Sequence, residues 1–288
     1  MKRRWAVKEH HRNIHVVTID LPRVGDEQAI LCQSDVHWDN PHCRRDLLTE
    51  HLDEAKDRDA VVLNNGDWFC AMQGKWDKRA NKNDLRPEHQ RADYLDALVS
   101  TSAKFLKPYQ DHFALLGQGN HETSILSHHE TNISDRLVQA LKLQGSSVAH
   151  LGGYSGFVVF SVKHAGRGRS FKMHYHHGPN AGGAVTKGVI GSARQAAYLT
   201  DADLVWSGHS HDSWQLPLAR IRLNNDNTAV CHERQVHFRT AGYKEEYGDG
   251  YGGYHIEKGR PPKPVSAAWL VFRVKKSGVI DYDLIEAK

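Results

Sequence analysis

The fold is decided first by residues 29–39, whose sequence is AILCQSDVHWD. A short apolar run of this kind is typical of a buried strand, and polar side chains follow it directly. Among them, Asp35 and His37 are two positions apart, so both can face one ligand at the end of the strand. A carboxylate and an imidazole together suit a divalent transition metal, although an isolated Asp-x-His pair is also common in a polar loop.

The composition is that of a globular protein. Of the 288 residues, 39% are hydrophobic and 25% are charged, and we expect one domain over residues 1–288. The net charge of +4 favours a phosphate-rich partner only slightly, because 38 basic residues are nearly matched by 34 acidic ones. The sequence has neither the apolar core of a signal peptide nor a run of roughly 18 apolar residues, which predicts a cytoplasmic protein with no membrane partner. The four cysteines lack close pairing and are expected to be reduced thiols.

Apolar runs and amphipathic stretches alternate in the first half of the chain. Strands are predicted at residues 14–19, 29–32, 61–63 and 113–116, and helices at 40–56, 87–107 and 133–143. Later strands are predicted at 157–162, 170–175, 204–206, 218–223, 230–238 and 268–274, with a helix at 192–199 and a hairpin turn at 224–227. This pattern predicts an α/β fold of two packed sheets with helices outside. The Gly/Tyr/Lys-rich loop at 242–264 is too long for an ordinary connection and is predicted to be functional or mobile.

Four further polar clusters follow predicted strands. They are Asn64-Asn65-Gly66-Asp67, Gly117-Gln118-Gly119-Asn120-His121-Glu122, His174-Tyr175-His176-His177 and Gly208-His209-Ser210-His211. Open α/β sheets bind ligands at the carboxyl ends of their strands, and glycines let the backbone approach a charged group closely. Crowded histidines would repel one another if protonated, so neutral imidazoles bound to metal explain them better than a solvated surface does. Each cluster alone has a plainer explanation, such as a turn, but five in succession favour a metal site.

The ordered set of motifs resembles the calcineurin-like metallophosphoesterase superfamily over residues 35–211. The resemblance implies a four-layer α/β/β/α sandwich with a dinuclear metal site at the strand ends. It assigns one divalent cation to Asp35, His37 and His211. It assigns the second cation to Asn120, His209 and one histidine of the pair His176 and His177, of which family members with adjacent histidines before a proline favour His176. Asp67 would bridge the two cations.

The same resemblance gives the catalytic roles. His121 would lie outside the metals, stabilise the transferring phosphoryl group and protonate the leaving oxygen, and Glu122 would orient it. Two divalent cations that share a carboxylate and a hydroxide can activate that hydroxide for in-line attack on phosphorus. Mixed oxygen and imidazole ligands suit Mn, Fe, Co, Ni or Zn, and no organic cofactor is implied.

The second motif differs from that of the protein serine/threonine phosphatases, because Cys70-Ala71-Met72 replaces their Asp-Arg-Gly. The Gly-His-x-His ending favours the phosphodiesterase and nuclease branch, and residues 34–39 with 243–247 resemble phosphoesterases of phages and prophages. The first hypothesis is therefore a phosphodiester hydrolase. The alternatives are a phosphomonoesterase and, in another class, a nucleic-acid-binding subunit of a phage or repair assembly. Candidate contacts for a nucleotide or nucleic-acid substrate are Lys75, Asp77, Arg79 and the Tyr/Lys segment 243–258.

Overall fold

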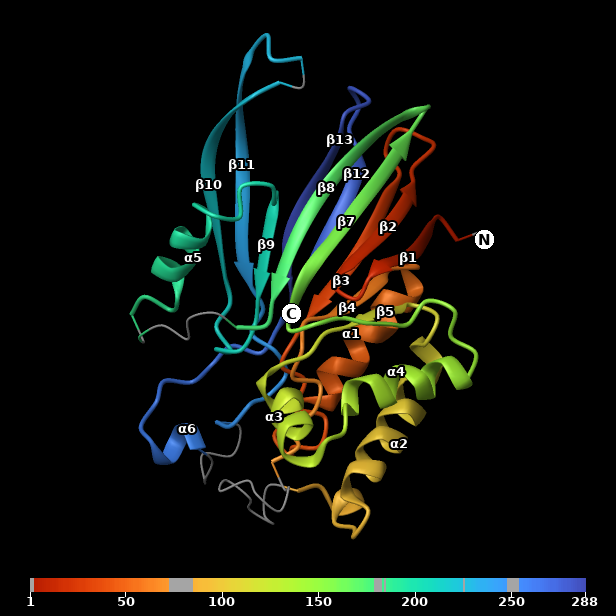
Figure 1. Ribbon diagram of the computed structural model, residues 1–288, viewed down its shortest axis with the longest axis vertical. Coiled ribbons are helices and arrows are strands. Elements are labelled where there is room, and N and C mark those ends of the chain that lie inside the picture. The colour runs from red at the N-terminus through yellow and green to blue at the C-terminus, as the bar shows by residue number, and fades with distance from the viewer. Residues whose placement is uncertain (1–2, 73–84, 179–182, 184, 225, 248–253) are drawn as a thin grey trace.

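Two mixed β-sheets form the framework of the molecule (Figure 1). The computed structural model describes residues 3–72, 85–178, 183, 185–224, 226–247 and 254–288. The predicted α/β class is confirmed, and so is each of the predicted strands. The hairpin predicted at 224–227 joins two paired antiparallel strands.

The six-stranded sheet carries the first three motifs. Its strands are β3 (Glu27–Gln33), β4 (Val61–Asn64), β5 (Phe113–Leu116), β6 (His150–Leu151), β12 (Ala267–Val274) and β13 (Ile280–Ala287). Their order is β13-β12-β3-β4-β5-β6, and β3 to β6 are parallel. β4 and β5 are buried along their whole length, as expected for parallel strands covered on both faces.

The seven-stranded sheet carries the histidine motifs. Its strands are β1 (Trp5–His11), β2 (Ile14–Asp20), β7 (Ser155–His164), β8 (Arg167–His176), β9 (Leu204–Ser207), β10 (Trp214–Leu223) and β11 (Val230–Arg239). Their order is β1-β2-β7-β8-β9-β11-β10, and β8, β9 and β11 are parallel. The carboxyl ends of β8 and β9 therefore lie at the same end of the molecule as those of β3, β4 and β5 (Figure 1).

An apolar core lies between the two sheets. Phe160, Phe171 and Trp206 of the seven-stranded sheet pack in one buried cluster with Leu63 and Phe272 of the six-stranded sheet. Burying a side chain of this size contributes about 1.5–3 kcal/mol, so this layer fixes how the two sets of strand ends face each other.

Helices cover the other face of the six-stranded sheet. They are α1 (Arg45–Asp57), α2 (Tyr94–Leu106), α3 (Asn120–His129) and α4 (Ile133–Leu143), and α1, α2 and α4 share a second buried cluster with β3, β4 and β5. α1 buries Leu48, Leu52 and Ala55, the spacing of one helix face. Two shorter helices are α5 (Val189–Gln195), beside β9 and β10, and α6 (Tyr254–Glu257) (Figure 1). Among the helices that the structure describes, none is long and apolar enough to cross a membrane.

Three predicted helices have wrong boundaries. The helix predicted from residue 40 begins at Arg45, because Asn40 accepts a 2.9 Å hydrogen bond from the amide of His42 and Cys43 pairs with Lys244 in an isolated β-bridge. The helix predicted from residue 87 is a short 3-10 turn followed by α2, and the helix predicted at 192–199 is α5. β1, β6, β13, α3 and α6 were not predicted, since their apolar patterns are short or interrupted by charge.

Candidate metal centre

The loops after β3 and β4 are held together by their backbones. The amide of Asp35 donates to the carbonyl of Gly66 at 3.1 Å, and the amide of His37 donates to the carbonyl of Asp67 at 3.1 Å. The side chain of Asn64 accepts from the amide of Gly66 at 3.0 Å. These bonds satisfy backbone groups after the strands have ended, and they bring the first two motifs side by side.

Five of the predicted ligands have a left-handed backbone conformation. Their φ angles are 51° at Asp35, 51° at His37, 51° at Asp67, 70° at His209 and 55° at His211. Positive φ is uncommon outside glycine and costs conformational energy, and such residues gather at functional sites. The fold therefore stabilises an unfavourable backbone at the positions where the sequence predicts a metal.

Glycines make room for the carboxylates. A Cβ atom at Gly208 would lie 2.6 Å from the Asp35 carboxylate, and one at Gly119 would overlap the Asp67 carboxylate. A Cβ atom at Gly242, whose φ is +94°, would lie 2.6 Å from the Cβ atom of Asp35 and 2.7 Å from its carbonyl oxygen. The close approach of backbone to carboxylate explains the glycines of the motifs at 119 and 208.

The first group of candidate ligands contains Asp35, His37 and His211, whose ligand atoms lie within 4.8 Å of one another. The Nε2 atoms of the two histidines are 3.3 Å apart, and Nε2 of His211 is 3.6 Å from a carboxylate oxygen of Asp35. Burial raises the pKa of the Asp35 carboxyl to about 7. Burial, with the charges of His121 and His211, holds the pKa of His37 well below its usual range, so the ring is neutral and able to bind metal.

The second group contains Asp67, His177 and His209, again within 4.8 Å. Nε2 of His177 is 3.1 Å from Asp67 and 3.9 Å from Asp35, which places this ring between the two carboxylates. Burial alone would lower the pKa of His177, but the charge and hydrogen bond of Asp67, the charge of Asp35 and the hydrogen bond to Asn65 together outweigh burial and raise this pKa to about 10. A divalent cation between these side chains would take the place of the His177 proton, so the donor set fits a metal.

A buried orphan atom also fits a metal at this position. The side-chain oxygen of Asn120, the first residue of α3, is buried and has no hydrogen-bond partner among the described residues. Buried polar atoms in folded proteins nearly always have a partner, and a neutral carbonyl oxygen is a suitable ligand for a divalent cation.

The structure brings His177, rather than His176, to the centre. The Nδ1 atom of His177 donates to the carbonyl of Asn65 at 2.6 Å, which leaves Nε2 to face the carboxylates. His176 instead accepts from the amide of Gly178 at 3.2 Å and packs edge-on against Tyr154. The geometry therefore does not support the preference for His176 that the adjacent-histidine pattern suggested.

His121 lies at the edge of both groups. Its Nδ1 atom donates to the carbonyl of Cys70 at 2.5 Å, its ring lies edge-on to His37, and its Nε2 atom is 3.8 Å from Asp67. The Cys70 carbonyl thus orients the ring and leaves Nε2 facing the centre. This position agrees with a group that touches substrate.

Glu122 has other partners than the one predicted. Its carboxylate is fully buried and accepts hydrogen bonds from the amides of Gly119 at 2.8 Å, Asp67 at 3.0 Å and Phe69 at 2.9 Å. None of its hydrogen bonds in the described structure goes to the ring of His121. Burial, together with the charge of Asp67, raises the pKa of Glu122 to about 8. Its geometry is that of a residue that positions Asp67.

Two supporting residues were missed at the sequence level. The carboxylate of Asp39 accepts hydrogen bonds from the amides of Cys70 at 2.7 Å and Ala71 at 2.9 Å. These bonds fix the loop segment in which the Cys70 carbonyl orients His121. Arg239, at 2% exposure, donates to the hydroxyls of Ser207 at 3.0 Å and Ser210 at 2.8 Å. These two bonds clamp the loop that carries His209 and His211. In the sequence, the one sign of these two supporting residues was that each is a charged residue in or beside an apolar stretch.

The Tyr/Lys segment, residues 243–258, begins with a buried residue that supports the metal centre. The amide of Tyr243 donates to the carbonyl of Asp35 at 3.0 Å, and its fully buried ring bonds through the hydroxyl to His51 at 2.9 Å. Tyr243 is therefore not available to contact a substrate, contrary to the prediction. Lys244 forms an ion pair with Glu246. Residues 248–253 of this segment, and the predicted contacts Lys75, Asp77 and Arg79, lie outside the described residues.

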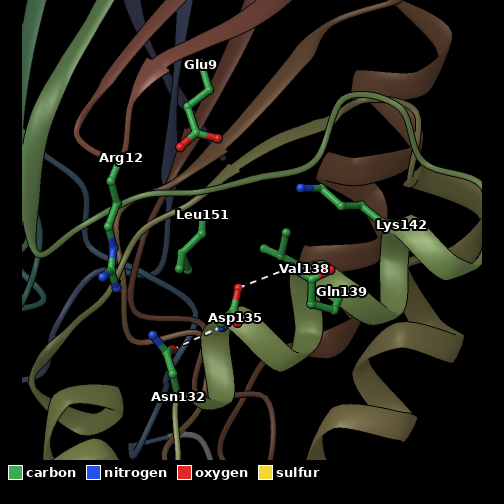
Figure 2. A pocket seen from close by; sticks show the side chains of 8 residues that line it. All are labelled: Glu9, Arg12, Asn132, Asp135, Val138, Gln139, Lys142 and Leu151. Carbon is green, nitrogen blue, oxygen red and sulfur yellow. Dashed lines mark hydrogen bonds between the residues drawn. The ribbon is translucent and has the colours of Figure 1, made fainter.

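A cavity of about 340 Å³ lies elsewhere, between the turn after β1 and helix α4. Figure 2 shows Arg12 and Lys142 extending toward it from opposite sides. None of the predicted ligands lines it, although Arg12 lies 3.5 Å from the side chain of Gln118. The cavity has mixed charge, and none of the three-residue clusters of ligand atoms found among the described residues lies there, so the strand-end cluster remains the candidate site.

Comparisons with known proteins give weak similarities. No protein-family model matches the sequence, and no curated protein is significantly similar to it. A metallophosphoesterase from Sphaerobacter thermophilus has 13% identity and a TM-score of 0.36, over 91% of this chain and 90% of that one. A conserved uncharacterised protein of Streptococcus pneumoniae, a predicted phosphoesterase, has 12% identity and a TM-score of 0.33, over 91% and 98%. Vps29 of Entamoeba histolytica, solved with zinc, has 11% identity and a TM-score of 0.34, over 90% and 99%. Similarities this low carry no argument, so the function is argued from the side chains.

Proposed function

We propose that this chain is a dinuclear-metal phosphoesterase of the calcineurin-like type that hydrolyses phosphodiesters. The observation that carries the proposal is the pair of adjacent ligand groups, Asp35 with His37 and His211, and Asp67 with His177 and His209. His177 joins the groups, since its Nε2 atom lies within 3.9 Å of both carboxylates. Neither group contains a thiolate, and this donor set suits Mn, Fe, Co, Ni or Zn.

Within this proposal Asp67 would serve as a ligand to both cations, and Asn120 would add a ligand to the second one. Two bound divalent cations would supply an activated hydroxide and polarise the phosphoryl oxygens. His177, held by the carbonyl of Asn65, is the histidine of the adjacent pair that binds metal. The four-layer sandwich, in which α5 would belong to the outer layer, and the phage-type branch are also parts of the proposal.

His121 is the proposed acid and phosphoryl contact. With Nδ1–H fixed on the carbonyl of Cys70, only Nε2 can give a proton to the leaving oxygen. The carboxylate of Asp67 lies 3.8 Å from Nε2, so this nitrogen faces the proposed metal centre, where the leaving oxygen would lie. The role needs no side-chain partner for His121, because a backbone carbonyl performs the orientation that an Asp provides in phosphoprotein phosphatases.

Preference for a diester follows from charge. A phosphate monoester carries an additional negative charge at neutral pH, and enzymes that favour monoesters commonly place an extra cation beside it. Ala71 stands where the phosphoprotein phosphatase motif has that Arg. Discrimination between substrates must come from such contacts, since the metals and His121 would act on the phosphoryl group that both esters share.

The test combines metal content with two substrates. Elemental analysis should give two divalent cations per chain, and kcat/KM should be higher for a generic aryl phosphodiester than for the matched monoester. Shortening the chain within residues 248–260, which leaves Tyr243 in place, should reduce turnover of nucleotide diesters more than that of the aryl diester. A monoester preference unaffected by this deletion would favour the phosphomonoesterase. Two metals with no turnover of either ester would favour a nucleic-acid-binding subunit.

A further inference from the structure

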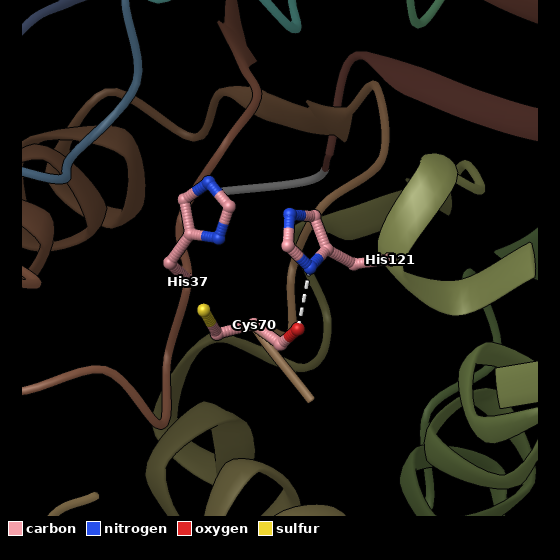
Figure 3. Close-up of side chains that lie close together, drawn as sticks. All are labelled: His37, Cys70 and His121. Carbon is pink, nitrogen blue, oxygen red and sulfur yellow. Dashed lines mark hydrogen bonds between the residues drawn. The ribbon is translucent and has the colours of Figure 1, made fainter. Parts of the chain in front are cut away.

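A third cluster of ligand atoms lies beside the two groups of the metal centre. His37, Cys70 and His121 place one ligand atom each within 4.8 Å of one another. Figure 3 shows the two rings side by side, with the Cys70 sulfur beneath His37. The cluster combines the loops after β3 and β4 with the start of α3, so the same backbone bonds that build the metal centre also build this cluster.

The chemistry of this cluster differs from that of its neighbours. It contains a thiol, whereas the other two groups offer only carboxylates and imidazoles. Thiolates favour soft cations, and two histidines with one cysteine are three ligands of a tetrahedral zinc site. A hard cation such as Mn²⁺ gains little from sulfur. The third cluster therefore discriminates between metals in a way that the proposed catalytic groups do not.

The burial and hydrogen bonds of these three side chains leave atoms that could bind a cation. Cys70 is 3% exposed, and its sulfur accepts a 3.5 Å hydrogen bond from the side chain of Asn40, which fixes its direction. His37 is 2% exposed, and its Nδ1 atom is buried with no hydrogen-bond partner among the described residues. His121 uses Nδ1 for the carbonyl of Cys70, so its free nitrogen is Nε2.

His37 belongs to two clusters at once, and this sharing has a functional consequence. It is grouped with Asp35 and His211 in the metal centre and with Cys70 and His121 here. A neutral imidazole offers one lone pair, so a cation bound in the third cluster competes with the cation held by Asp35 and His211. The same cation would occupy the His121 nitrogen that the proposed function assigns to the phosphoryl group.

We propose that His37, Cys70 and His121 form an inhibitory site for a soft divalent cation, such as Zn²⁺ or Cd²⁺. Binding displaces the thiol proton to solvent and removes both histidines from their catalytic positions. The binding itself depends only on the three side chains, whereas the inhibition rests on the proposed phosphoesterase function. The two parts can therefore fail separately.

Binding is tested by adding Cd²⁺ to the protein loaded with Mn²⁺. A thiolate-to-cadmium charge-transfer band should grow to one equivalent in the wild type and be lost in Cys70→Ser. Cys231→Ser, which changes the partly exposed cysteine of β11, is the matched control and should keep the band. In the wild type with added Zn²⁺, X-ray absorption should show a sulfur neighbour at about 2.3 Å, a result that depends on no variant. A band that survives in Cys70→Ser, or a wild type with neither band nor sulfur neighbour, overturns the site.

Inhibition is tested in the same samples. The inhibition constant for Cd²⁺ should rise at least about tenfold in Cys70→Ser, with each rate taken relative to that variant's own uninhibited rate. Equal inhibition of both proteins, with the band dependent on Cys70, would mean that cadmium inhibits by replacing the catalytic metals, and the inhibitory role would be wrong. A Cys70-dependent band in a protein that hydrolyses no ester would refute the proposed function and leave the binding site in place.

Discussion

The two sheets support their share of the metal centre in opposite ways. The six-stranded sheet supplies Asp35, His37 and Asp67 on loops rich in backbone amides, and the buried anions Glu122 and Asp39 accept hydrogen bonds from those amides. The seven-stranded sheet supplies imidazoles. There a buried cation, Arg239, donates to the hydroxyls and to a carbonyl around the loop 207–211.

This difference follows from what each loop must offer the metals. Where carboxylate side chains serve as ligands, the buried backbone amides of the same loops need other hydrogen-bond acceptors. A buried carboxylate that accepts from several amides meets that need. Each ligand group draws on both sides, since Asp35 and His37 join His211, and Asp67 joins His177 and His209. Bound metals would therefore link the two sheets, and the substitutions below distinguish the contributions of the two sides.

Asp67→Asn should have the largest effect, because Asp67 is the carboxylate shared by both cations in the proposal. Turnover should fall to background, and elemental analysis should find fewer than two metals per chain. In the wild type a chelator should lower the melting temperature, since cations that bind only the folded chain stabilise it, whereas the variant should respond little. Retention of two metals and near-normal turnover would show that Asp67 does not bridge.

His121→Asn separates chemistry from metal binding. His121 contacts His37 and Asp67 but belongs to neither of the two ligand groups proposed to hold the catalytic cations. Content of the catalytic metals should therefore stay at the wild-type level while kcat falls about 10²–10⁴-fold, the usual contribution of a positioned acid or base. Loss of a metal in this variant would make His121 a ligand and transfer the proton-donor role elsewhere.

Glu122→Gln tests the anion that supports the six-stranded side. Both carboxylate oxygens accept from backbone amides, so a glutamine must turn its NH₂ group toward at least one N–H donor. Metal affinity should fall about 10–100-fold, as for other groups that orient ligands. Glu130→Gln, at the exposed end of the same helix, is the control and should bind metal normally. If kcat alone changes and metal affinity does not, Glu122 orients His121 as the sequence first suggested.

The ligand positions could be predicted from the sequence because they follow buried strands at once. Runs such as Val61–Asn64 are apolar along their whole length, so their ends are easily located, and the polar residues beyond them meet at one edge of the sheet. The choice between His176 and His177 was also present in the pattern. Every second residue of β8 from Phe171 to Tyr175 has its side chain in the core. Continuing this period of two by one step reaches His177.

The supporting residues could not be predicted, because their partners are far away in the sequence. Arg239 contacts Ser207, and Asp39 contacts the amide of Ala71, through pairings that only the assembled sheets create. The false helix start at Asn40 has the same origin, since the bridge between Cys43 and Lys244 overrides a local capping signal. Local patterns thus locate the ligands, and tertiary contacts decide what holds them.

The smallest expected effect concerns a buried histidine of the seven-stranded sheet. Burial, with the charge of His150, lowers the pKa of His15 to about 4, and both ring nitrogens are buried without hydrogen-bond partners in the described structure. Between this value and the usual pKa of about 6.5, the unfolded chain binds a proton that the folded chain does not. The free energy of unfolding should therefore decrease as the pH falls from 6.5 toward 4.

His15→Phe should remove part of that decrease, on the order of 1 kcal/mol, when denaturation curves are measured across this range. Val17→Ala, on the same strand, should lower stability equally at each pH and leave the slope unchanged. If His15→Phe keeps the wild-type slope, the acid sensitivity does not originate at His15.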